Sequence, residues 1–182
     1  MIPLDRRDWI EKRKHIEDRE SKERAIVEKL LPFLEGKIVA GYMPILGEVD
    51  VTRFLGERIQ YLPKTDPRSN RIRFEKFDPE TKLEKGHFNV MEPPIDPLSD
   101  PSQIDVILVP LVAFSNTNRL GYGKGYYDRY LKTSKALHIG LAFEEQEGEF
   151  MIQPWDVALD YIITDKRILA KKRGDNYECC YK

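Results

Sequence analysis

Ile104-Asp-Val-Ile-Leu-Val-Pro110 is the stretch that decides the fold of this 182-residue chain. Its apolar residues follow one another without alternation, which is typical of a parallel strand covered on both faces. Further strands are predicted at 37–43, 60–63, 70–77, 137–142 and 161–164, and helices within 5–34, 49–59 and 127–135. Because strands and helices alternate, we expect one α/β domain over residues 1–182 with a mostly parallel sheet. We also expect a long proline-containing loop at 78–103 and a polar tail from about residue 171.

The composition excludes several classes of protein. Hydrophobic residues make up 41% of the chain, which is enough for a packed core. Charged residues make up 34%, but the net charge is only −1, so no overall field attracts nucleic acid or an anionic membrane. The longest apolar run, 106–114, is far shorter than the ~20 residues of a membrane helix. The first 30 residues carry charges throughout and show no signal-peptide pattern, and the adjacent Cys179 and Cys180 form no disulfide framework, so we expect a cytoplasmic location.

A glycine-rich stretch follows the decisive strand: Arg119-Leu-Gly-Tyr-Gly-Lys-Gly-Tyr-Tyr-Asp128. A strand, a glycine loop and a helix together present backbone N–H groups to an anion. Lys124 and Arg119 add positive charge for phosphate oxygens, and Asp128 offers a carboxylate to Mg²⁺. The order of residues fits neither the P-loop nor the dinucleotide-binding fingerprint. The stretch therefore indicates phosphate binding, with an ordinary turn as the alternative.

The longer run from Arg119 to Leu131 closely resembles the signature of the 5-formyltetrahydrofolate cyclo-ligases, also called methenyltetrahydrofolate synthetases. Shorter family motifs occur in the same order along the chain: Tyr42-Met-Pro, Glu48-Val-Asp50, Leu62-Pro63, Met91-Glu-Pro93, Asp105-Val-Ile-Leu-Val-Pro110 and Ile163-Thr164. The resemblance implies a ligase of one-carbon metabolism. With ATP and Mg²⁺ it would convert 5-formyltetrahydrofolate to 5,10-methenyltetrahydrofolate, ADP and phosphate through a phosphorylated formyl intermediate. We expect a single three-layer Rossmann-like domain, similar to the ribose-phosphate isomerase and CoA-transferase class.

The resemblance also implies roles for individual residues. ATP would be bound by Arg6, Arg7, Arg119, Leu120, Gly121, Tyr122, Gly123, Lys124, Gly125, Tyr126 and Tyr127. The folate would be bound by Met43, Glu48, Phe88, Tyr122, Gly123, Lys124, Gly125 and Tyr126. Lys124, Arg119 and Tyr126 would be the catalytic residues. Asp128 and Asp156 would hold Mg²⁺, with Asp160 as the local alternative to Asp156.

Two positions depart from the family pattern. Relatives carry a lysine and, four residues later, an arginine that reach the ATP phosphates. Arg7 best matches that arginine, but Pro3 stands in place of the lysine, so either the phosphate clamp is lighter or Arg6 supplies the missing cation. Phe88 stands where the family often has tryptophan, and its ring would stack on the folate.

Two other functions remain open. A nucleotide- or folate-binding module without catalysis would keep the same glycine loop. Lys124-Gly-Tyr126 also echoes an RNA-binding strand motif, but Tyr127 and Asp128 stand where small and apolar residues are expected, and the chain has no basic surplus. We therefore expect small-molecule substrates, no nucleic acid, no membrane and a monomer. The active-site cleft should lie at the carboxyl ends of the central strands, where the loops at 43–50 and 115–128 can meet.

Overall fold

The computed structural model describes residues 4–172. Its helices are α1 (Arg6–Lys14), α2 (Arg19–Leu34), α3 (Val51–Leu55) and α4 (Tyr126–Leu131). Short 3₁₀ turns are η1 (Gly56–Arg58), η2 (His87–Asn89), η3 (Pro101–Gln103) and η4 (Glu144–Gln146). The strands are β1 (Val39–Ala40), β2 (Ile59–Asp66), β3 (Arg71–Lys76), β4 (Glu84–Lys85), β5 (Met91–Glu92), β6 (Val106–Val109), β7 (Ala113–Ser115), β8 (Asn118–Leu120), β9 (Leu137–Leu141), β10 (Tyr161–Ile163) and β11 (Ile168–Ala170).

Seven of these strands form one sheet, in the order β11-β10-β9-β6-β1-β2-β3. The pairs from β10 to β2 are parallel, and the edge strands β11 and β3 are antiparallel to their neighbours. β6 lies in the middle, and all four of its residues are buried. The expectation of an α/β fold with a mostly parallel sheet is therefore confirmed. The run at 106–109 is continuously apolar because this central strand is covered on both faces.

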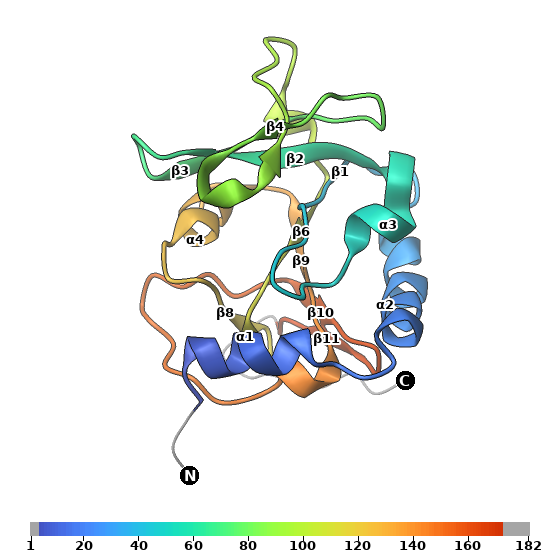
Figure 1. Ribbon diagram of the computed structural model, residues 1–182, viewed down its shortest axis with the longest axis vertical. Coiled ribbons are helices and arrows are strands. Elements are labelled where there is room, and N and C mark those ends of the chain that lie inside the picture. The colour runs from blue at the N-terminus through green and yellow to red at the C-terminus, as the bar shows by residue number, and fades with distance from the viewer. Residues whose placement is uncertain (1–3, 173–182) are drawn as a thin grey trace.

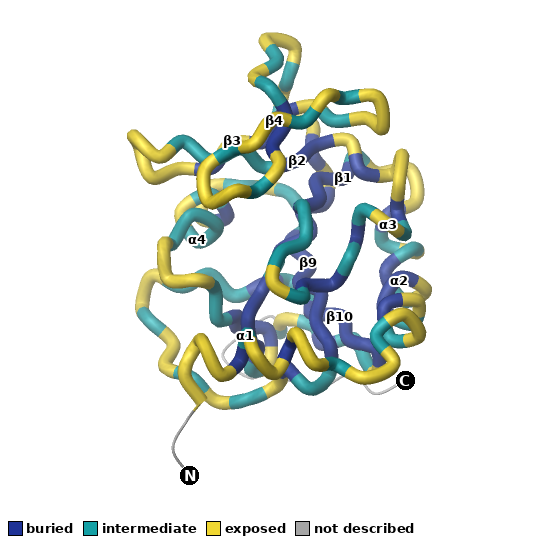
Figure 2. Tube along the Cα trace, in the orientation of Figure 1, coloured by how far each residue is buried: buried dark blue, intermediate teal, exposed yellow. Residues whose placement is uncertain are grey.

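Helices cover both faces of the sheet. Val106 and Leu108 point into a core that α2 and α3 complete, whereas Ile107 and Val109 point into a second core that α4 completes. Figure 1 shows α2 and α4 on opposite sides of β6 and β9. Figure 2 shows the buried residues concentrated on these central strands. The result is three layers of helix, sheet and helix, with the loops at the strand ends left accessible.

Several element boundaries differ from the sequence prediction. α3 ends at Leu55, so that β2 begins at Ile59 and runs to Asp66, and α4 ends at Leu131 rather than near residue 135. No strand was predicted after Thr164, which is wrong, because β11 pairs with β10 there. A three-residue edge strand between lysines and arginines carries too little pattern to be recognised.

A small hairpin, β7–β8, follows the central strand, and its second strand contains Arg119 and Leu120, the first residues of the glycine-rich stretch. Ala113 of this hairpin packs with Trp9 of α1 and Val112 in a satellite core. The hairpin therefore brings the start of the glycine-rich stretch beside α1, although more than 100 residues separate the two in sequence.

None of the helices within residues 4–172 is long and apolar enough to cross a membrane. Cys179, Cys180 and the polar tail beyond residue 172 lie outside the described residues.

Candidate active site

The N-terminal helix supplies the first cation of the site. Asp5 caps α1 by accepting hydrogen bonds from the backbone N–H groups of Arg7 and Asp8, which fixes where the helix begins. Arg6, the first helical residue, donates from Nε to the carbonyl oxygen of Gly121 at 2.9 Å. No contact of the Arg7 side chain with the glycine loop is found among residues 4–172. Of the two candidates, Arg6 is the one that the structure brings to the glycine loop, and Pro3 lies outside the described residues.

The glycine loop, residues 121–125, is built from conformations that favour glycine. Gly123 and Gly125 have φ angles of +91° and +70°. A Cβ at Gly121 would lie 2.8 Å from Nη1 of Arg119, so this position is restricted by space rather than by φ. Lys124 is exposed, and in the described part of the chain its ammonium group has no partner. α4 has only six residues, so phosphate binding would rest on loop N–H groups and these cations rather than on a long helix.

Arg119 lies beneath the loop and is nearly fully buried. Its Nη2 lies 3.4 Å from Oδ2 of Asp128, Nη1 donates to the carbonyl of Pro110 at 3.3 Å, and the guanidinium stacks over the Tyr127 ring. Two buried polar atoms here have no partner within residues 4–172: Nε of Arg119 and the hydroxyl of Tyr127. Burial raises the pKa of the Tyr127 phenol, which therefore stays a hydrogen-bond donor. Unpartnered buried donors are costly unless a ligand satisfies them.

Of the two carboxylates that were expected to hold Mg²⁺, Asp128 contacts the backbone directly after Asp156. Oδ1 of Asp128 accepts a hydrogen bond from the N–H of Val157 at 3.1 Å, which docks the loop containing Asp156 beside α4. Oδ2 of Asp156 accepts from Gln153 at 2.8 Å, whereas the alternative, Asp160, is engaged by the N–H of His138.

No cluster of three or more acidic, histidine or cysteine side chains suited to a metal occurs within residues 4–172. Mg²⁺ commonly takes one or two carboxylates together with substrate phosphates and water. Asp128 and the neighbouring loop that carries Asp156 offer two carboxylates near the glycine loop, which is the number that this ion commonly takes.

Glu48 stands at the opposite wall of the site, in the loop after β1. It is 6% exposed, its Oε1 accepts from the Tyr122 hydroxyl at 2.8 Å, and its Oε2 accepts from the N–H of Ile45 at 2.9 Å. Burial raises the pKa of the Glu48 carboxyl, and the nearby Arg13 guanidinium opposes that rise. The loops at 43–50 and 115–128 thus meet through a direct side-chain contact.

Arg13 of α1 completes this contact, and the sequence reasoning did not assign it a role. It is fully buried, and its Nη2 donates to the Tyr122 hydroxyl at 2.6 Å. The signal that could have found it is its spacing of four residues from Trp9 and three from Ile10. This spacing places a cation on the apolar face of the helix.

Two apolar side chains border the site. Met43 is half-buried against the core on the α2 side. Phe88 is 54% exposed and lies edge-on to Tyr126, with ring centroids 6.4 Å apart. Its φ angle is +60°, a strained conformation for a residue with a large side chain.

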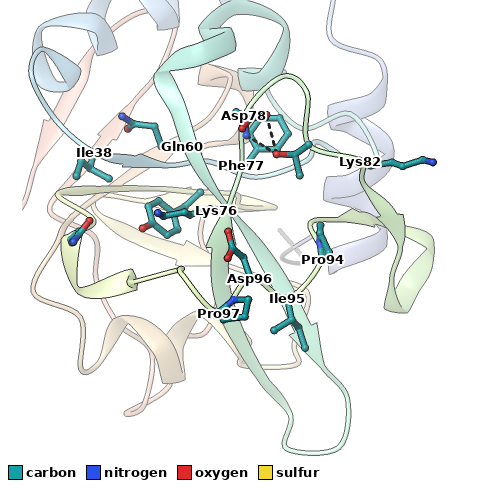
Figure 3. Close-up of a pocket in the computed structure, with 13 residues that line it drawn as sticks. Ile38, Gln60, Lys76, Phe77, Asp78, Lys82, Pro94, Ile95, Asp96 and Pro97 are labelled. Carbon is teal, nitrogen blue, oxygen red and sulfur yellow. Dashed lines mark hydrogen bonds between the residues drawn. The ribbon is translucent and has the colours of Figure 1, made fainter.

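A hollow of about 380 Å³ adjoins Glu48, lined also by Lys14, Arg19 and Arg53. A larger cavity of about 600 Å³ lies elsewhere, with Ile38, Gln60 and Lys76 in its lining (Figure 3). Because Ile38 precedes β1 and Gln60 lies near the start of β2, this cavity is at the amino ends of these strands. Met43 and Glu48 follow the carboxyl end of β1, and none of the expected site residues lines the larger cavity.

Comparison with known proteins gives a consistent result. Residues 5–165 match the model of the 5-formyltetrahydrofolate cyclo-ligase family. The 5-formyltetrahydrofolate cyclo-ligase of Escherichia coli K12 is 30% identical over 154 residues, covering 75% of this chain and 82% of that protein. The Mycoplasma pneumoniae enzyme of the same name is 54% identical over 70 residues, or 37% of this chain, and the Mycoplasma genitalium one 51% over 67. These two alignments span less than half of each relative's length, 43% and 41%.

Two solved structures share the fold. The Aquifex aeolicus 5,10-methenyltetrahydrofolate synthetase superimposes with a TM-score of 0.78 at 33% identity, covering 95% of this chain and 94% of that chain. The Mycoplasma pneumoniae 5,10-methenyltetrahydrofolate synthetase superimposes with a TM-score of 0.66 at 35% identity, covering 88% and 96%.

Proposed function

The chain belongs to the 5-formyltetrahydrofolate cyclo-ligase family, and from that premise we propose that it cyclises 5-formyltetrahydrofolate to 5,10-methenyltetrahydrofolate, with conversion of MgATP to ADP and phosphate. The observation that carries the proposal is the 2.8 Å hydrogen bond from the Tyr122 hydroxyl to Glu48. It joins a glycine loop, whose lysine has no partner within residues 4–172, to a buried carboxylate. A triphosphate and a nitrogen heterocycle would be bound side by side at this junction.

The proposed chemistry has two steps. The formyl oxygen attacks the γ-phosphorus of ATP, and the bond from that phosphorus to the bridging oxygen breaks to release ADP. N10 of the folate then attacks the formyl carbon and loses its proton, and the carbon–oxygen bond breaks to release phosphate. Phosphorylation converts a poor leaving oxygen into a good one, so the protein contributes mainly positioning and neutralisation of charge.

The cations around the glycine loop would supply that neutralisation. Arg6 and Lys124 would bind phosphate oxygens from the solvent side, and Arg119 would meet the charge that develops on the transferred group. Mg²⁺, held by Asp128 and Asp156, would neutralise further phosphate charge. Tyr126 would position the reacting groups from the start of α4.

The opposite wall would bind the folate. Glu48 would accept hydrogen bonds from ring nitrogens and the amine of the pterin, because a carboxylate strengthens bonds from such donors. Met43 would pack on the ring face, and Phe88, beside Tyr126, would stack on the remainder of the folate. Tyr122 would contact both substrates, since it is the residue that joins the two walls.

The test is the near-ultraviolet absorbance of the methenyl product. We expect it to appear only when ATP, Mg²⁺ and 5-formyltetrahydrofolate are all present. Absence of the product with all three present would overturn the proposal.

Asp128→Asn separates the enzyme from a binding module without catalysis. The variant keeps an oxygen for the N–H of Val157 but loses the charge beside Arg119. We expect turnover to fall at least 100-fold while the folate dissociation constant changes less than threefold. Asp78→Asn, in an exposed loop by the distant cavity, is the matched control. A binding module would show equal folate binding in both variants and no turnover in the wild type.

A cytoplasmic location and a monomeric state stay predictions.

A further inference from the structure

Arg13 is a buried cation without a carboxylate in direct contact. Its side chain is completely inaccessible, and within residues 4–172 no carboxylate oxygen lies within 4.0 Å of its guanidinium nitrogens. Burial of a guanidinium is costly unless hydrogen bonds or a negative charge compensate for the water that it loses. This compensation comes from four hydrogen bonds that Arg13 donates and from one negative charge that it reaches through another side chain. The acceptors lie on both walls of the candidate site.

Three of these hydrogen bonds go to backbone carbonyls. Nε donates to Leu46 at 3.1 Å and Nη2 to Ile45 at 3.5 Å, both in the loop that carries Glu48. Nη1 donates to Leu111 at 2.6 Å, directly after the decisive strand. The fork geometry of a guanidinium is what allows one side chain to join three separate segments.

The fourth hydrogen bond leads to the missing negative charge. Nη2 of Arg13 donates to the Tyr122 hydroxyl at 2.6 Å, and this hydroxyl donates in turn to Oε1 of Glu48 at 2.8 Å. Because the hydroxyl oxygen accepts from a cation, its own proton must point at the carboxylate. Arg13 and Glu48 therefore form an ion pair bridged by one phenol, and Tyr122 is held by the charges on either side of it.

We propose that Arg13 is a positioning residue for folate binding: it fixes the 44–48 loop and Tyr122, and it keeps Glu48 ionised as the acceptor for the pterin. This inference rests on the proposed function. Arg13 itself touches neither substrate in this scheme. Without the charge of Arg13, burial would favour the protonated form of the Glu48 carboxyl more strongly, and a protonated carboxyl is a weaker acceptor for the pterin edge.

Other groups around Glu48 cannot replace Arg13. Arg119 also faces the carboxylate, but it is paired with Asp128. Tyr42 and Tyr127 are buried phenols, whose pKa values burial raises, so they carry no charge at neutral pH.

On the side of the adjoining hollow, Arg19 is engaged with Glu23 and with the Gly47 carbonyl, and Arg53 with Glu20. Lys14 is paired with Glu11, and Asp50 caps α3. The buried side of Glu48 thus has Arg13 as its dedicated cation in the described part of the chain.

The first measurement uses the ligand-free protein, so it does not depend on the reaction. Carboxyl NMR of Glu48 is followed against pH in the wild type, Arg13→Gln and Tyr122→Phe. We expect the Glu48 titration to move to higher pH in both variants. Tyr122→Phe keeps the three carbonyl contacts of Arg13, so it gives an answer even if Arg13→Gln fails to fold.

The second measurement is the KM for 5-formyltetrahydrofolate between pH 6.5 and 9. Arg13→Gln should raise this KM at least 10-fold at pH 6.5 and by a smaller factor at pH 9, because a rising pH favours the ionised form of Glu48. Arg13→Lys keeps a charge without the fork, so it should recover part of the affinity and more of the pH profile. Arg24→Gln, an exposed arginine on α2, is the matched control and should behave as the wild type.

Two outcomes would contradict the inference. An unchanged Glu48 titration in both variants is one. The other is a wild-type folate KM and pH profile in Arg13→Gln, with a lower melting temperature as the sole effect, because Arg13 would then be structural only. If instead the wild type forms no methenyl product, the proposed function fails, while the ligand-free titration still decides the role of Arg13.

Discussion

Phe88 stores conformational strain at the point where it is expected to meet the folate. Its φ angle of +60° costs a non-glycine residue about 1–2 kcal/mol. We expect Phe88→Gly to raise the free energy of unfolding by about 1 kcal/mol and to weaken folate binding at least fivefold, because the exposed ring is lost. Urea denaturation and folate titration measure the two effects.

Asn89 is the matched control, since it has the same φ angle without an aromatic ring. Asn89→Gly should also stabilise the protein but leave folate affinity unchanged. Weaker folate binding in Asn89→Gly, or unchanged binding in Phe88→Gly, would contradict a stacking role for the ring.

Tyr127 tests whether a buried hydroxyl that has no partner within residues 4–172 binds a ligand. Its hydroxyl has no partner within residues 4–172, so Tyr127→Phe removes an unsatisfied donor. We expect the free energy of unfolding to rise by up to about 1 kcal/mol, since the desolvation penalty disappears. The KM for ATP should rise three- to tenfold if the hydroxyl binds the nucleotide. Tyr130→Phe, on the same helix, should leave this KM unchanged, and equal KM values in both variants would argue against nucleotide contact.

For individual residues, the sequence identified the cations of the glycine-rich stretch but not the groups that each of them contacts in the structure. Lys124 is exposed and unpaired within residues 4–172, as a phosphate ligand should be, whereas Arg119 is buried against Asp128. Spacing alone could not have distinguished them, because the difference arises from the β7–β8 hairpin that folds Arg119 inward. Arg13 could not be assigned either, since its acceptors come from three distant segments.

Among the elements, α1 is the one whose docking controls the site, because it carries both Arg6 and Arg13. Trp9 fixes it against Gly148, where an added Cβ would lie 2.4 Å from the indole ring. Gly148→Ala should therefore cost about 1–3 kcal/mol of unfolding free energy by overpacking. It should also raise the KM for ATP, since displacement of α1 moves Arg6 away from Gly121.

A second substitution checks that cause. Trp9→Leu in the Gly148→Ala background removes the clash, so the double variant should lose less stability than the sum of the two single variants. Strict additivity would show that Gly148 acts through another neighbour.

Element prediction from sequence succeeded where tertiary contacts and local pattern agree. β6 is apolar and buried along its whole length, β9 is buried at four of its five residues, and both were found. β1 was predicted over seven residues but covers only Val39–Ala40, and its register with β2 shifts between these two residues. The β7–β8 hairpin was missed, since β7 lies mostly within an apolar run without visible alternation and β8 is three residues with only one apolar side chain.

For the whole molecule, the free energy of unfolding should decrease at acid pH because of His138. This residue of β9 is buried, and burial lowers its pKa below the ordinary value, with Asp160 opposing and Lys171 adding to the effect. The unfolded chain takes up a proton below about pH 6.5, whereas the folded protein resists it, so acidification favours unfolding.

His138→Gln removes this titration. We expect the stability of the wild type, relative to the variant, to fall between pH 7.5 and 5.5, as measured by urea denaturation at both pH values. A difference between the two proteins that does not change with pH would show that His138 does not titrate on unfolding.

The strand order has a consequence for how the chain assembles as it is synthesised. β1 lies between β2, which follows it closely, and β6, which begins 66 residues after β1 ends. Until Val109 has emerged from the ribosome, the sheet formed by β3, β2 and β1 has no partner at its β1 edge, and until residues near 141 have emerged, the unpaired edge lies at β6. Such delayed, non-local pairing slows folding and exposes apolar surface. Nascent chains of this protein that stop before β9 should therefore be the species that recruit chaperones.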